Sequence, residues 1–547
     1  MNLTILWISL ITILATILRM IGIDKAGGLW NDEYISWSIA TLPLGKAFLK
    51  GIASQCHMPL YYLYLKIFTL ISNNDLWLRF SSVIPAIISV PVMYLVGKNK
   101  SKLCGILCAL FVATSSFLIY FSQEVRFYSL LFLLAALTLL FTLRVTQKPN
   151  IKNLIGLIIS NALIILTHTI GFVFVFFDLL FVSLILFKEN NCKKKIIIGW
   201  CSCGIAFLAM LPLIYRIFTT ISFSQWWAKF SIRRILQVFV DFFTPVISQI
   251  LPIEALNGYH LYAGLIIIAT LIALIVIIIG LFYSKAQKNN LVFYIALAVF
   301  LVMIFAAMLG KIVFEAKYMI EIYPILIFVF FNTVLSFSKK RIKIPVLLIF
   351  FAIQFGYLFM PYSAQNMPRE EGHKYVAQLI KSAHLKLNDY IVLTYYPQNR
   401  FEKYQDFSKY NVISIHKGNF NEYLLPSITY KEAVKTGKKQ YHGTFINATL
   451  PVGVFQGSKL IFYINNNIYK KMHKGQKVAF IFLDSISFLD ETTFSNVVTN
   501  PKFYEATPLL YIVFSDFRNE IIKTIPIQAK NIHYEVKGSW TLVSFEK

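Results

Sequence analysis

Two adjacent acidic residues, Asp32 and Glu33, follow the first long apolar segment of the chain and lie among aromatic residues. An ionised side chain at the centre of a bilayer costs roughly 2.5–3.5 kcal/mol on insertion scales, so we expect both carboxylates at the membrane interface. A carboxylate at that place could act as the general base that takes a proton from an attacking hydroxyl group. Either Asp32 or Glu33 could take this role, and a solvated pair of loop residues is the structural alternative.

Ionisable and aromatic residues also stand at the ends of later apolar segments, where they could bind an anionic group. Cations and N–H donors stabilise a departing phosphate, and an arginine can do so with two parallel hydrogen bonds. Glu124 is a further carboxylate that could orient the acceptor or the base. The candidates for binding the phosphate and the rest of the substrate are His57, Arg79, Arg126, Tyr128, His168, Lys317 and Tyr318.

Several of these residues also have an ordinary structural explanation. Glu124 could belong to an ion pair at a segment end, although its spacing of two from Arg126 puts the two side chains on different faces of a helix. His168 stands in a predicted turn, where a histidine often bonds to the backbone, and Lys317 could be a snorkelling anchor. The pair Trp226–Trp227 is better explained by an interfacial aromatic belt than by sugar binding.

The composition predicts a membrane protein with many spans. Of the 547 residues 57% are hydrophobic and 14% are charged, whereas a soluble protein has about 25% charged residues. The net charge of +26 suggests nucleic-acid binding at first, but many basic residues lie in short connections between apolar segments, where they indicate topology and attraction to anionic lipids. We therefore expect contact with membrane lipids and no nucleic-acid partner. The six cysteines show no metal-binding spacing, and we predict no disulfide framework.

About 20 apolar residues make one membrane crossing, and the chain has about eleven such segments. The first is too long for the core of a signal peptide and lacks a cleavage site, so we expect a retained span. Five clusters of basic residues all fall in alternate connections, which the positive-inside rule makes cytoplasmic. The N-terminus is then cytoplasmic and the C-terminal part extracytoplasmic. The predicted spans are 3–23, 76–97, 103–120, 126–146, 151–167, 169–187, 195–217, 261–283, 291–310, 317–337 and 343–361.

Near residue 361 the composition changes to that of a soluble protein. We predict a membrane domain at 1–361, mainly α-helical, with outer loops at 24–75 and 218–260. An extracytoplasmic α/β domain follows at 362–547.

The predicted C-terminal domain shows sequence patterns of both a helix and strands. The stretch 371–396 has the spacing of a helix, a turn at Asn388–Asp389 and then the β-branched and aromatic residues of a strand. The runs 478–482 and 509–514 predict further buried strands. The domain offers no catalytic triad, metal spacing or phosphate loop, so we expect it to face the acceptor or to be structural.

Four motifs stand in order along the first 361 residues. They are Trp-x-Asp-Glu at 30–33, His-x-Pro-Leu-Tyr-Tyr-Leu at 57–63 with Leu-Arg-Phe at 78–80, Ser-Gln-Glu-Val-Arg-Phe-Tyr-Ser-Leu at 122–130, and Ala-Lys-Tyr at 316–318 before Pro324. Together they resemble the GT-C-fold membrane glycosyltransferases. The nearest resemblance is to bacterial proteins similar to the dolichyl-phosphate-mannose protein mannosyltransferases and the lipid A aminoarabinose transferase.

The resemblance implies an inverting glycosyltransferase that uses a polyprenyl-phosphate sugar, with Asp32 as the catalytic base. The carrier would be undecaprenyl phosphate, and the acceptor a lipid, glycan or protein at the outer face of the bacterial cytoplasmic (inner) membrane. Met58 stands where such proteins usually have proline. Lys317 stands where they have arginine, which keeps the charge but loses the two-pronged contact. Some of these proteins bind a divalent metal, for which this sequence shows no local ligand spacing.

Two other functions are compatible with a chain of many spans. A transporter or flippase of lipid-linked sugars often has internal repeats and ionisable residues at mid-membrane, whereas here the charges gather at one face and no repeat is evident. A polysaccharide polymerase or ligase also has many spans and outer loops. The early Asp-Glu loop and the large C-terminal domain disfavour it.

Overall fold

The computed structural model describes residues 3–55, 57–187, 193–220, 232–243, 260–282, 290–309, 314–358, 372–395, 398–416, 464–483, 525–526, 529–538 and 540–547. The chain divides into two compact units. The helical unit comprises Met1–Ile23 and Ile35–Met367, and the sheet unit comprises Asp24–Tyr34 and Pro368–Lys547. The sheet unit thus includes a segment of the first outer loop that the sequence analysis assigned to the membrane domain.

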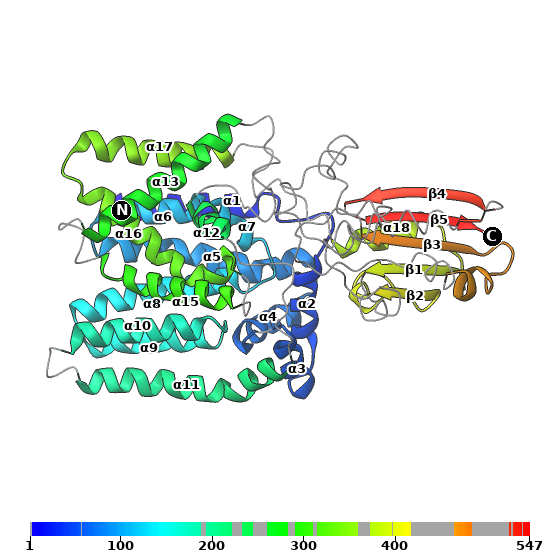
Figure 1. Cartoon of the computed structure of the whole chain (residues 1–547), viewed down its shortest axis with the longest axis horizontal. Helices are drawn as coiled ribbons and strands as arrows, with labels where there is room; N and C mark the ends of the chain where they lie inside the picture. The colour runs from blue at the N-terminus through cyan, green and yellow to red at the C-terminus, as the bar shows by residue number, and fades with distance from the viewer. Residues whose placement is uncertain are drawn as a thin grey trace, which may run out of the picture. The chain divides into compact units, whose positions relative to one another are not determined.

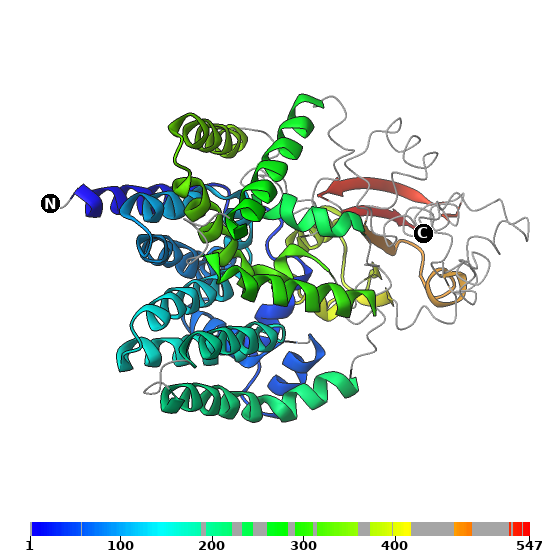
Figure 2. The same cartoon turned by 60° about the vertical axis from the view of Figure 1, so that its left-hand side comes forward.

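A helix occupies each of the eleven segments that the sequence predicts as spans, because each is a long run of apolar residues. The helices are α1 (Leu3–Met20), α5 (Asp75–Lys98), α6 (Lys102–Thr114), α7 (Ser116–Ser122), α8 (Tyr128–Gln147), α9 (Ile151–Ile165), α10 (Gly171–Leu186), α11 (Lys193–Thr220), α13 (His260–Phe282), α15 (Phe293–Met308), η3 (Ala316–Ile322), α16 (Tyr323–Ser336) and α17 (Lys340–Leu358). Helices α8 to α11 lie side by side in both views (Figures 1 and 2).

Five helices in the described ranges are long and apolar enough to cross a membrane, at Leu3–Met20, Asp75–Lys98, Tyr128–Gln147, Lys193–Arg216 and Ala316–Ser336. Helices α6 and α7 would make a sixth span with a bend of 54°. Shorter apolar helices in the described ranges lie at Pro59–Ile71, Ile151–Ile165, Gly171–Leu186, Ile267–Phe282 and Phe293–Met308. The chain is a multi-pass membrane protein, and eleven crossings stay a prediction.

The bend between α6 and α7 is at Ser115. Its backbone is not helical, with φ −61° and ψ 116°, and its hydroxyl accepts a hydrogen bond from the N–H of Leu118 at 3.4 Å, which begins the new helix. The same hydroxyl lies 3.2 Å from that of Tyr323 on α16. A polar side chain therefore fixes both the break and its contact with a distant helix.

Small and polar residues bring the helices together. A Cβ atom on Gly97 would lie 2.7 Å from the carbonyl oxygen of Cys104, so glycine allows the close approach of α5 and α6. Arg19 on α1 is fully buried, and its guanidinium donates to the carbonyls of Val112 and Ala113 at 2.9 and 3.1 Å. These contacts satisfy polar groups that the membrane interior would leave without water.

Four further helices lie in the predicted outer loops, where the sequence analysis expected no helix. They are α2 (Asn31–Thr41), α3 (Lys46–Ser54), α4 (Pro59–Ile71) and α12 (Ile232–Phe243). Lys66 on α4 donates to the carbonyls of Ala40 and Leu42 at 3.0 and 2.7 Å, and so caps the end of α2. Most of the loop 218–260, with Trp226–Trp227, lies outside the described residues.

The sheet unit contains α18 (His373–Ser382) and five strands in the order β2-β1-β3-β5-β4. Strands β1 and β2 are parallel, as are β1 and β3, whereas β3 with β5 and β4 with β5 are antiparallel. The strands are β1 (Tyr390–Tyr395), β2 (Asn411–His416), β3 (Lys477–Leu483), β4 (Lys530–Lys537) and β5 (Trp540–Glu546). The predicted helix and strand within 371–396 and the strand at 478–482 are confirmed, while 509–514 lies outside the described residues.

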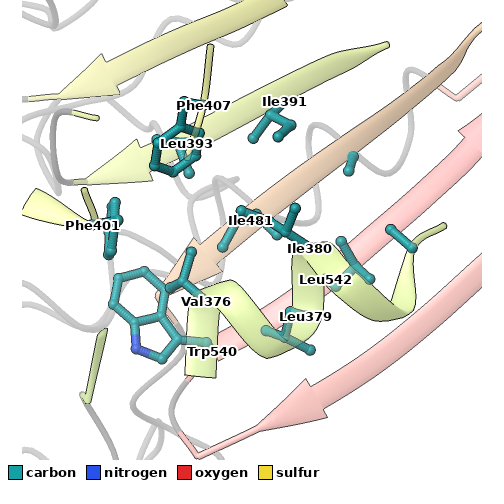
Figure 3. Close-up of a cluster of buried hydrophobic side chains, with 12 residues drawn as sticks. Val376, Leu379, Ile380, Ile391, Leu393, Phe401, Phe407, Ile481, Trp540 and Leu542 are labelled. Atoms are coloured by element: carbon teal, nitrogen blue, oxygen red, sulfur yellow. The ribbon is translucent and has the colours of Figure 1, made fainter. Parts of the chain in front are cut away.

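Alternation along the central strands creates a core on each face of this sheet. Val392 and Phe480 point to one face, whereas Ile391 and Ile481 point to the other. Figure 3 shows the second core, in which α18 packs on the sheet beside Phe401 and Trp540.

Candidate active site

The segment Asp24–Tyr34, which we call the acid loop, contains the start of α2 and the two carboxylates. Glu33 is fully buried, and its Oε2 atom accepts a hydrogen bond from the N–H of Trp30 at 3.2 Å. This is the contact that a glutamate in the first turn makes in a capping box. Glu33 therefore stabilises the start of the helix.

Asp32 occupies a different environment one residue earlier. Its side chain is only partly buried, and its Oδ1 atom accepts a hydrogen bond from the side-chain amide of Asn31 at 3.3 Å. It lies in the first turn of α2, where the helix dipole favours a negative charge. Of the two acids, Asp32 is the one whose side chain is partly accessible to solvent.

Two histidines meet in the helical unit. His57 and His168 form an isolated antiparallel backbone bridge, and the ring of Phe127 lies 4.9 Å from each imidazole. The Nδ1 atom of His57 is 2.6 Å from the hydroxyl of Tyr62. We call the set His57, Arg126, Phe127 and His168 the histidine–arginine cluster.

Arg126 lies in the irregular segment between α7 and α8. Its carbonyl accepts from the hydroxyl of Ser82 at 3.0 Å, and its N–H donates to the carbonyl of Glu124 at 2.7 Å. Its guanidinium donates to the hydroxyl of Ser36 at 3.3 Å and lies over the rings of Phe127 and Tyr128. The buried guanidinium is thus held by the backbone break, one hydroxyl and two aromatic faces.

Lys317 and Tyr318 lie on η3, which packs against α8. The Nζ atom of Lys317 is 3.0 Å from Glu315 Oε2 and lies 5.0 Å from the centre of the Tyr318 ring, and Arg234 is 3.7 Å from the other oxygen of Glu315. Lys317 is therefore part of an ion-pair group, which the sequence analysis did not predict.

The structure brings the helical-unit candidates into one neighbourhood through Tyr128. Its phenol interacts electrostatically with Glu124, Arg126, Lys317 and Tyr318. His57 in turn interacts with Arg126 and His168. Burial, followed by the charges of these two residues, lowers the pKa of His57 well below its usual value, so His57 can offer a neutral imidazole but not a cation.

The sequence analysis missed Glu321, which is also on η3. Its carboxylate is fully buried, 3.6 Å from the Nδ1 atom of His168, and among the described residues neither of its oxygens has a hydrogen-bond partner. A buried carboxylate without hydrogen bonds is costly. The signal that could have identified it is a single acid inside an apolar segment, which is functional by default in a membrane protein.

Arg79 is hydrogen-bonded to the backbone near the end of α1. It is fully buried, and its guanidinium donates to the carbonyl of Ile23 at 2.9 Å, just beyond the end of α1. As for a metal, the described part of the chain contains no group of three or more His, Cys, Asp or Glu side chains that could hold one.

Two solved structures are similar to this chain. The solved structure of ArnT from Cupriavidus metallidurans bound to undecaprenyl phosphate has 8% sequence identity and a TM-score of 0.49, covering 99% of this chain and 97% of that chain. The Archaeoglobus fulgidus oligosaccharyltransferase tethered to an acceptor peptide has 10% identity and a TM-score of 0.46, covering 99% and 88%. No curated protein matches the chain.

The family comparison covers the middle of the membrane domain. Residues 56–216 match the model of the dolichyl-phosphate-mannose-protein mannosyltransferase family. This range includes His57, Glu124, Arg126 and His168, and it begins after the acid loop. The match confirms the resemblance that the ordered motifs predict: over residues 56–216 the chain is similar to the dolichyl-phosphate-mannose-protein mannosyltransferases.

Proposed function

We propose that the protein is a membrane glycosyltransferase that moves a sugar from a polyprenyl-phosphate carrier to an acceptor of the cell envelope. The observation that carries this proposal is the family match over residues 56–216. We place the reaction at the outer face of the bacterial cytoplasmic membrane, with undecaprenyl phosphate as the carrier and inversion at the anomeric carbon. The acceptor is a lipid, a glycan or a protein.

Asp32 acts as the general base in this proposal. The acceptor hydroxyl oxygen attacks the anomeric carbon, its proton passes to the carboxylate, and the bond from that carbon to the phosphate oxygen breaks with its electron pair on the phosphate. The partial exposure of Asp32 and the capping contact of Glu33 support this division of roles. Glu124 orients the acceptor or the base.

Cations and N–H donors of the helical unit stabilise the leaving phosphate. Arg126 is buried among aromatic rings, where an ionic contact is stronger than in water. Lys317 adds a second positive charge, His57 serves as a neutral donor, and His168 offers a further ring N–H. Tyr128 and Tyr318 supply hydroxyl groups beside these cations.

The test uses purified protein in lipid vesicles with undecaprenyl phosphate linked to mannose, glucose or aminoarabinose, together with an envelope fraction that supplies acceptors. We expect release of free undecaprenyl phosphate and transfer of the labelled sugar to one acceptor class. Movement of intact labelled donor across the bilayer without release would instead identify a transporter. Growth of a glycan chain by many sugars on one acceptor would identify a polymerase.

A further inference from the structure

The backbone of the acid loop is bound to the start of α18. The N–H of Lys374 donates to the carbonyl of Gly27 at 2.9 Å, and the N–H of His373 donates to that of Leu29 at 3.0 Å. The first N–H groups of a helix have no partner inside it, and the N-cap of α18, Gly372, provides no side chain to accept them. The acid loop therefore caps this helix with its own carbonyl groups.

Gly372 is required for this close approach. A Cβ atom at residue 372 would lie 2.1 Å from the carbonyl oxygen of Gly27 and 2.4 Å from its carbonyl carbon. Both atoms belong to the backbone, so a side-chain rotation cannot relieve the clash. Any larger residue at 372 must push the acid loop away from α18.

Two tyrosines fix the loop on either side of Asp32. The hydroxyl of Tyr404 accepts from the N–H of Leu29 at 2.8 Å, three residues before Asp32. Two residues after it, the buried side chain of Tyr34 donates its hydroxyl to the carbonyl of Asn399.

These contacts continue into the core of the sheet unit. The ring of His373 lies 5.2 Å from that of Tyr34 and 5.0 Å from that of Phe401, and Phe401 lies 5.4 Å from Trp540. Phe401 and Trp540 are fully buried in the core beside α18 (Figure 3). Through His373 the acid loop is thus linked to a buried core whose residues lie more than 330 positions later in the chain.

We propose that the sheet unit positions the acid loop for catalysis, with Gly372, Tyr34 and Tyr404 as positioning residues that hold the backbone around Asp32. This inference rests on the proposed function, because it assumes that Asp32 is the base. It gives the C-terminal domain a role in the chemical step, beyond the acceptor-facing or structural role that the sequence suggests.

The first test is Gly372→Ala in the full-length protein in vesicles, with Gly356→Ala as the matched control because a Cβ atom there meets nothing within 4 Å. We measure amide hydrogen exchange of Asp24–Tyr34, binding of undecaprenyl phosphate, and kcat and KM for the donor. For Gly372→Ala we expect faster exchange, unchanged binding and KM, and a kcat lowered by about 10- to 100-fold, since small misplacements of reacting groups cost that much. The control should match the native protein.

A second variant keeps the inference testable if Gly372→Ala does not fold. The double variant Tyr34→Phe and Tyr404→Phe removes two hydroxyl groups but keeps both rings, and Tyr534→Phe is its control because Tyr534 is 57% exposed on β4. We again expect faster exchange in the acid loop and a lower kcat at unchanged KM.

The inference is overturned if, in either variant, the amide hydrogens of the acid loop exchange as in the native protein. It is also overturned if they exchange faster while kcat is unchanged. A raised KM at native kcat also overturns it, because the contacts would then serve binding. Failure of the proposed function is separate: full activity of Asp32→Asn would exclude Asp32 as the base, whatever the acid loop does.

Discussion

The acid loop and the histidine–arginine cluster differ in how far their functional groups are exposed. Backbone hydrogen bonds to α18 and to Tyr404 hold the acid loop, and its Asp32 remains partly exposed. In the cluster, ring packing and side-chain contacts hold Arg126 and His168, which are 4% and 3% exposed. The difference fits the two roles that we propose: a base must be reached by its substrate, whereas a group that stabilises charge acts more strongly when water is excluded.

Among substitutions in the helical unit, we expect the largest loss of activity from Arg126→Gln. Loss of the buried cation should lower kcat by about 10²- to 10³-fold, as the removal of one charge-stabilising donor does in other enzymes. Arg144→Gln is the control, since Arg144 also lies over an aromatic ring but belongs to the last turn of α8. Equal losses of activity in the two variants would mean that Arg126 has no special role in catalysis.

We expect smaller effects on stability and activity from substitutions of two buried acids in the helical unit. Asp178 accepts hydrogen bonds from Thr142 at 2.6 Å and Asn161 at 2.8 Å. In the described part of the chain, Glu321 lies 3.6 Å from His168 and its oxygens have no hydrogen-bond partner. Asp178→Asn should lower the free energy of unfolding by about 1–3 kcal/mol with native activity per folded molecule, because the amide has one acceptor oxygen where the carboxylate accepts two hydrogen bonds. Glu321→Gln should keep stability and lower kcat by about tenfold or more, because His168 loses the charge that orients it.

Thermal unfolding and donor turnover, measured on both variants, check this contrast. A loss of stability in Glu321→Gln with unchanged kcat would make Glu321 a structural residue like Asp178.

The smallest effect that we expect is a dependence of the stability of the sheet unit on pH. Burial lowers the pKa of His373 to about 3, against an ordinary value of 6.5, although a backbone hydrogen bond at Arg400 and the charge of Glu33 act in the other direction. Between these values the unfolded chain binds a proton and the folded unit does not. The stability of the sheet unit should therefore fall as pH falls from 6.5 towards 3.

His373→Phe keeps the ring contacts but removes this titration. We expect its unfolding temperature to fall less than that of the native protein between pH 7.5 and 4.5, with His533→Phe on the exposed strand β4 as the control. A native-like fall in His373→Phe would show that other groups cause the pH dependence.

Sequence patterns predicted the helices and part of the sheet because both follow from local periodicity. Long apolar runs gave a helix at each predicted span, and the change of pattern near Asn388 gave α18 followed by β1. The helices α2, α3, α4 and α12 were not predicted, since none of them has the length of a membrane crossing. Their positions depend on contacts such as those of Lys66 with the end of α2.

The site was predictable where a residue type alone suggests chemistry. Asp32, Arg126 and His168 stand out as polar residues beside apolar segments. The grouping of Asp24–Tyr34 with the sheet unit was not predictable, because hydrogen bonds between residues more than 340 positions apart leave no periodic signal. The capping contact of Glu33 with Trp30, which supports the proposed roles of the two acids, likewise became visible only in the structure.

The most direct test of the central claim compares Asp32→Asn with Glu33→Gln in the undecaprenyl phosphate release assay. Hydrogen exchange of the acid loop confirms that both variants fold. We expect Asp32→Asn to lower kcat by about 10³-fold, within the range for loss of a general base, and Glu33→Gln to keep most activity because glutamine can still accept from the N–H of Trp30. Native activity of Asp32→Asn, or full activity of the double variant Asp32→Asn and Glu33→Gln, would contradict the assignment of the base to this loop.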